Sequence, residues 1–76
     1  MNKYEIIIEG MHCNACSNLI SMELEDAYLQ DVNVIFEKKK ANFTSEKDLK
    51  DIKEIIKTLF ENEDIKKYQV ISIEQV

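Results

Sequence analysis

The two cysteines of the chain are its clearest candidates for chemistry. Cys13 and Cys16 are separated by two residues in the segment GMHCNAC, residues 10–16. Two thiols at this spacing suit a disulfide redox couple, half of a structural zinc site, or a two-thiolate site for a soft metal ion. An apolar run precedes the segment and a helical pattern follows it, so we expect the thiols in a loop between a strand and a helix.

The rest of the sequence favours the soft-metal site. A thioredoxin-like redox motif belongs to a larger fold with a proline after the active site, and this chain has no proline. Structural zinc takes four ligands, whereas the chain supplies Cys13, Cys16 and at best His12. Copper(I) is soft and prefers thiolates, and two of them can hold it. The sequence therefore predicts copper(I) binding without enzyme activity. Zinc, cadmium and mercury(II) are the alternative metals, and a thiol–disulfide enzyme is the least favoured alternative function.

The neighbours of the cysteines suit this role. Cys16 is expected in the first turn of a helix, where unbonded N–H groups and the positive dipole end favour a thiolate. Gly10 lets the chain leave the preceding strand at a dihedral that other residues resist. Met11 is predicted to pack into the core rather than bind metal through its thioether. His12 adjoins Cys13, so their side chains should diverge, and we expect an exposed neighbour rather than a third ligand.

Hydrophobic periodicity predicts the elements that position this loop. Alternating apolar residues predict strands at 3–9, 32–37, 40–44 and 68–74. Apolar spacings of three and four predict helices at 15–27 and 49–60. In the first helix, Leu19 and Met22 are expected to widen the apolar face, and Thr44 or Ser45 is expected to cap the second. Phe36 is expected on the inner face of the second strand.

The predicted order of elements is β-α-β-β-α-β. This is the α+β, ferredoxin-like arrangement, in which a four-stranded antiparallel sheet carries two helices on one face. A chain of 76 residues makes a single domain, 1–76, with a modest core. Its hydrophobic content of 45% is that of a globular protein rather than a disordered chain.

Charge and hydropathy exclude some partners. The net charge of −5 argues against nucleic acid, and the lysine clusters at 38–40 and 66–67 are expected to be solvated turns. No apolar run approaches the roughly 20 residues that cross a membrane, and the N-terminus does not resemble a signal peptide. We therefore expect no direct membrane insertion and a cytoplasmic location, where thiols stay reduced.

The segment GMHCNAC resembles the Gly-Met-x-Cys-x-x-Cys signature of heavy-metal-associated domains. These include cytosolic copper chaperones and the N-terminal metal-binding domains of copper-transporting P-type ATPases. The resemblance implies copper(I) bound by Cys13 and Cys16, with Met11 as a buried loop anchor. It also implies metal exchange with a P-type ATPase or a similar domain through shared ligands. The family resemblance further implies a monomer without metal and a possible metal-bridged dimer.

The chain departs from the family pattern in its turns. The family often has glycine before its second strand and in its hairpin, where this chain has YLQD (28–31) and lysines 38–40. The connection before the last strand, 60–68, also has no glycine. Lys66, Lys67 and Tyr68 are candidates for the family's residue that faces the metal from this connection. A free-standing chaperone is the first prediction, favoured by the short distance from Met1 to the first strand, and an ATPase domain is the alternative.

Overall fold

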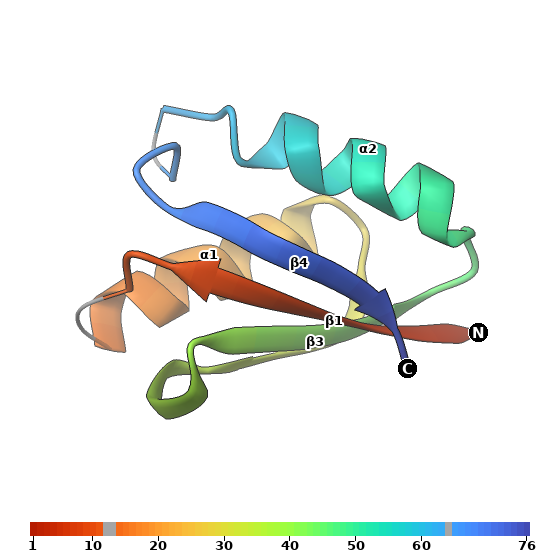
Figure 1. Cartoon of the computed structure of the whole chain (residues 1–76), viewed down its shortest axis with the longest axis horizontal. Helices are drawn as coiled ribbons and strands as arrows, with labels where there is room; N and C mark the ends of the chain where they lie inside the picture. The colour runs from red at the N-terminus through yellow and green to blue at the C-terminus, as the bar shows by residue number, and fades with distance from the viewer. Residues whose placement is uncertain (12–13, 64) are drawn as a thin grey trace.

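The computed structural model describes residues 1–11, 14–63 and 65–76, and its main elements follow the predicted order (Figure 1). The strands and α-helices follow in the order β1 (Asn2–Glu9), α1 (Asn14–Asp26), β2 (Gln30–Ile35), β3 (Lys40–Ser45), α2 (Leu49–Leu59) and β4 (Gln69–Gln75). A short 3-10 helix, η1 (Phe36–Lys38), joins β2 to β3. Neither α1 nor α2 is long and apolar enough to cross a membrane.

The four strands form one antiparallel sheet in the order β2-β3-β1-β4. Strand β1 is central and pairs with β3 on one side and β4 on the other. Both helices pack on the same face of this sheet, α1 over β2 and α2 beside β4 (Figure 1). The ferredoxin-like fold predicted from the sequence is therefore confirmed.

The core lies between the sheet and the helices. Alternate residues of β1 are buried, and Tyr4, Ile6 and Ile8 are each at most 1% exposed. The same layer holds apolar side chains from the other elements, including Ile20, Leu24, Ala41, Phe43, Ile52, Ile56 and Ile65. The Tyr4 hydroxyl donates to the carbonyl of Lys47, so the one polar atom of this buried ring is bonded. Alternation along β1 thus fixes which face of the sheet receives the helices.

The apolar face of α1 differs in part from the predicted one. Ile20 and Leu24 are buried as expected, but Met22 is 62% exposed and does not widen the face. A helical residue turns by about 100°, so Met22 lies about 200° from Ile20, on the opposite side of the helix. Ser17 is buried instead. Ala27 lies just beyond the end of the helix at Asp26 and packs partly against the core.

The hairpin between β2 and β3 also differs from the prediction. Strand β2 ends at Ile35, and Phe36 belongs to η1 rather than to the strand. Lys39 adopts a left-handed conformation (φ 56°) and donates its N–H to the Phe36 carbonyl at 3.1 Å. Lys40 begins β3, as the predicted strand 40–44 expects, and its ammonium lies 3.4 Å from the Glu5 carboxylate. The lysine run therefore forms the turn through Lys38 and Lys39 only.

The start of α2 is capped by Asp48, not by Thr44 or Ser45. The Asp48 carboxylate accepts the N–H of Asp51 at 2.9 Å, the usual N-cap bond to the third helical residue. Ser45 ends β3 and uses its hydroxyl oxygen to accept the N–H of Lys47. The helix begins at Leu49, and two residues separate Ser45 from the capping residue Asp48. Ser45 is therefore not the N-cap.

Helix α1 ends in a Schellman motif with tyrosine in the place that glycine usually takes. Leu29 donates its N–H to the Leu24 carbonyl, and Tyr28 donates to Glu25. Tyr28 has φ 65°, a conformation in which a Cβ atom crowds the backbone. Its side chain is 92% exposed, so few contacts offset that strain. Leu24 and Leu29 are both buried, which supplies the apolar contact of this motif.

We expect Tyr28→Gly to stabilise the fold by about 1 kcal/mol. The substitution removes the strain of a left-handed residue with a Cβ atom, worth about 1–2 kcal/mol. Part of this gain is offset by the greater conformational freedom of glycine in the unfolded chain. Urea denaturation measures the change. Tyr28→Ala is the matched control, because it removes the exposed ring and keeps the Cβ atom. An equal gain in both variants, or a loss in the glycine variant, would show that the backbone is not the cause.

Candidate metal-binding loop

Three connections meet at the end of the molecule where β1 leads into α1. They are the residues Gly10 and Met11 that follow β1, the η1 turn between β2 and β3, and the connection from α2 to β4 (Figure 1). The N–H of Ile8 donates to the Lys39 carbonyl at 2.8 Å, which ties the η1 turn to the end of β1. On the other side, Gly10 lies against the backbone of Lys67 and the ring of Tyr68.

Cys16 occupies the first turn of α1, as predicted. Its side chain is half-buried and packs against the core, so its sulfur lies at the boundary between the core and the surface. Asn14 and Ala15 beside it are exposed. Cys13 and His12 lie outside the described residues, and their roles stay predictions.

Met11 is 1% exposed and belongs to the hydrophobic core. Its inward packing agrees with its predicted place as a core residue. A buried residue directly before the segment 12–13 fixes the backbone where the loop departs from the sheet. Burial of this side chain removes about the surface of one large apolar residue from water, a contribution of about 2 kcal/mol.

Gly10 is required by the backbone and by a close neighbour. Its φ of 102° lies in a region that residues with a Cβ atom rarely adopt. A Cβ atom at this position would lie 3.3 Å from both the Lys67 carbonyl oxygen and Tyr68 Cδ1. The sole glycine of the chain therefore allows the α2–β4 connection to pack directly on the start of the cysteine loop.

Tyr68 is the candidate from the α2–β4 connection that reaches the loop. Tyr68 is 3% exposed. It directly precedes β4, which begins at Gln69, so the predicted strand 68–74 begins one residue too early. Ile65 is fully buried and accepts the N–H of Tyr68 through its carbonyl at 3.0 Å, which holds this turn. Lys66 and Lys67 are exposed, and the Lys67 ammonium lies 5.3 Å from the centre of the Tyr68 ring.

Ser17 contributes a contact that sequence reasoning missed. Its hydroxyl donates to the Asn14 carbonyl at 2.7 Å within the first turn of α1, and the residue is 9% exposed. A serine that bonds a backbone carbonyl three residues earlier satisfies its own hydroxyl without a tertiary partner. A polar residue can therefore occupy an inward position beside Cys16. A serine in an otherwise polar stretch gives no distinct sequence signal for this.

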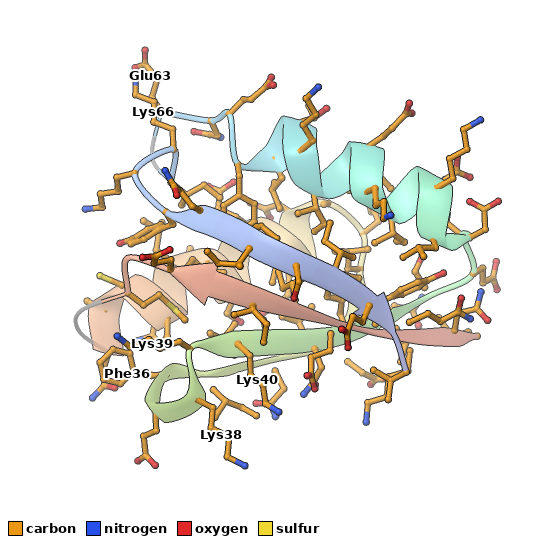
Figure 2. The ribbon with its side chains drawn as sticks, viewed as in Figure 1. Phe36, Lys38, Lys39, Lys40, Glu63 and Lys66 are labelled. Carbon is orange, nitrogen blue, oxygen red and sulfur yellow. The ribbon has the colours of Figure 1, made fainter. Side chains whose placement is uncertain are left out.

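Charged residues of both signs lie on the connections at the end that carries the loop. Lys39 approaches this end from the η1 turn, which also holds Glu37. On the α2–β4 connection, Lys66 and Glu63 lie beside each other (Figure 2). Two thiolates around one copper(I) ion carry a net negative charge, which a nearby ammonium group such as that of Lys39 would stabilise.

Comparison with known proteins agrees with this geometry. The family model of the heavy-metal-associated domain matches residues 5–61. A copper-binding domain of HMA7, a P-type ATPase, superposes with a TM-score of 0.69 at 22% identity, covering 100% of this chain and 95% of that one. A heavy metal binding protein from Thermotoga maritima superposes with a TM-score of 0.70 at 23% identity, covering 97% and 98%.

No curated protein sequence matches the chain. The two structural similarities are below 25% identity and establish the fold alone. The family model, by contrast, spans most of the sequence and includes the segment 10–16. The chain belongs to the heavy-metal-associated domain family.

Proposed function

We propose that the protein binds copper(I) through the thiolates of Cys13 and Cys16 and passes the ion to a partner. The observation that carries the proposal is the position of Cys16 in the first turn of α1, with Cys13 three positions earlier in the sequence and the buried Met11 before both. Two thiolates satisfy copper(I) and leave coordination positions open. The chain acts in this proposal as a carrier without enzyme activity, as one domain over 1–76, in the cytoplasm.

Transfer follows from the same coordination. A thiolate of the partner adds to the two-coordinate ion, one of the original thiolates then leaves, and the ion is never released into water. The partner in this proposal is a P-type ATPase or another heavy-metal-associated domain. Without metal the protein is a monomer, and two copies that share one ion would form a bridged dimer.

A second candidate function is that of a metal-binding domain within a P-type ATPase. The similarity to the copper-binding domain of such an ATPase supports it. The metal chemistry of Cys13 and Cys16 would be the same. Zinc, cadmium or mercury(II) are the other candidate ions, and His12 or a carboxylate would complete a zinc site.

The first test is the binding of copper(I) under anaerobic conditions. We expect the reduced protein to hold about one ion per chain against a competing chelator, because two thiolates suffice for this ion. A Cys13→Ser/Cys16→Ser variant should lose at least about a hundredfold in affinity, since hydroxyls are poor ligands for a soft ion. Ser17→Ala is a control that changes the same turn without removing a thiol. Equal binding by the double serine variant would refute the proposed ligands.

The choice of metal can be tested through His12. If copper(I) is held by the two thiolates alone, His12→Ala should leave its affinity within about threefold, a difference of less than 1 kcal/mol. Zinc affinity should fall by about tenfold or more if His12 is a zinc ligand, because four-coordinate zinc would lose one donor. Parallel chelator competitions with copper(I), zinc and mercury(II) measure both. A large loss of copper(I) affinity would make His12 a copper ligand.

Gly10→Ala tests the packing of the α2–β4 connection on the loop. We expect a loss of about 2–4 kcal/mol in the free energy of unfolding, because the new Cβ atom meets both an unfavourable φ and two close atoms. Urea denaturation measures the loss, and a double-mutant cycle with Tyr68→Ala separates the ring contact from the backbone. A change below about 0.5 kcal/mol for Gly10→Ala would contradict the required glycine.

A further inference from the structure

An open groove runs between α2 and β4, on the side of the sheet that carries the helices. Its volume is about 590 Å³, within the range of peptide and ligand sites. Apolar side chains line it and two lysines of α2 border it: Phe60, Val70, Ile71, Ile73, Lys53 and Lys57. Ile71 is 58% exposed, so a large apolar side chain meets water here in the described structure.

Strand β4 is an edge of the sheet, and its hydrogen-bond register shows which groups are open. Val76 donates its N–H to the Lys3 carbonyl at 2.8 Å, so these two form a bonded pair. Bonded and non-bonded pairs alternate along an antiparallel ladder. Glu74 is therefore bonded to β1, whereas Ile73 and Gln75 direct their N–H and C=O groups away from it. No other described strand lies on that side.

A bulge limits how much of this edge can be used. The register of β1 and β4 shifts between Ile7 and Ile8, which leaves Ile71 as the extra residue of β4. Bulges bend an edge strand and interrupt pairing. An added strand would thus pair beyond the bulge, along Ile73 to Gln75, while its other half lies over Ile71 and Phe60. The opposite edge, β2, presents the polar residues Asp31 and Asn33 instead.

The charge of the groove indicates its occupant. Lys53 and Lys57 are exposed, four residues apart on one face of α2, and within the described residues neither forms an ion pair. A chain of net charge −5 therefore borders this groove with two positive charges. A second copy fits poorly, because pairing β4 with β4 would bring both α2 helices to the same side of the joined sheet and place like charges near one seam.

We propose that the groove and the outer edge of β4 bind an extended segment of another protein in which acidic and apolar residues alternate. The segment adds a short strand to β4, its apolar side chains cover Ile71 and Phe60, and its carboxylates meet Lys53 and Lys57. Val70 pairs with Ile8 near the loop, whereas Gln75 pairs with Tyr4 at the far end of β1. The paired part of this surface thus lies away from Gly10, and docking leaves the cysteine loop accessible.

The probe is a capped eight-residue peptide that alternates valine and glutamate, added to the metal-free, reduced, isotope-labelled protein. We expect chemical-shift changes at the backbone amides of 71–75 and 53–60, and slower hydrogen exchange at Ile73 and Gln75. Lys53→Glu/Lys57→Glu should weaken binding at least about tenfold. The control is Lys3→Glu/Lys38→Glu, which changes the charge equally at two exposed lysines outside the groove and should change affinity less than about threefold.

Two modified peptides separate the parts of the proposal. A peptide with lysine in place of glutamate should fail to bind, because it repels Lys53 and Lys57. N-methylation of the residues that face β4 should also abolish binding, because it removes the N–H groups that a strand must donate. Absence of shifts at millimolar peptide, equal binding of either modified peptide, or self-association through 71–75 without peptide would each overturn the proposal. None of these readouts depends on metal.

Discussion

The end of β1 is held from both sides, and the cysteine loop depends on that constraint. On one side Ile8 bonds to the carbonyl of Lys39 in the η1 turn. On the other, the absence of a side chain at Gly10 lets Lys67 and Tyr68 pack against the backbone. The Met11 side chain then packs into the core and anchors the backbone where the loop begins. The base of the cysteine loop is therefore held in place by three separate contacts.

Helix α1 packs on the core along its length. Its inner face fills the core over β2 through Ile20 and Leu24, and in its first turn Cys16 packs partly buried against the same core. Ser17 lies inward beside it, because its hydroxyl donates to the Asn14 carbonyl and is not left unsatisfied. Cys16 is thus positioned by packing against the core and stays partly exposed.

The chain uses residues other than glycine where its turns need a left-handed backbone. Tyr28 closes α1 and Lys39 closes η1, each with positive φ. Tyr28 and Lys39 lie in 28–31 and 38–40, two of the three segments in which the sequence lacks the glycine expected from the family resemblance. A left-handed backbone at a residue with a Cβ atom comes at some loss of stability. At Lys39 the change also places an ammonium group at the end that carries the cysteine loop (Figure 2).

Much of the fold followed from the sequence because its signals are local. Alternation in β1 and three-four spacing in both helices predicted the order of elements and most of the core, and GMHCNAC predicted Cys16 in the first helical turn. Tertiary structure alone decided the rest. The cap at Asp48 and the transfer of Phe36 to η1 depend on where each element stops. The contact of Tyr68 with Gly10 joins residues far apart in the chain, and periodicity carries no information about such a contact.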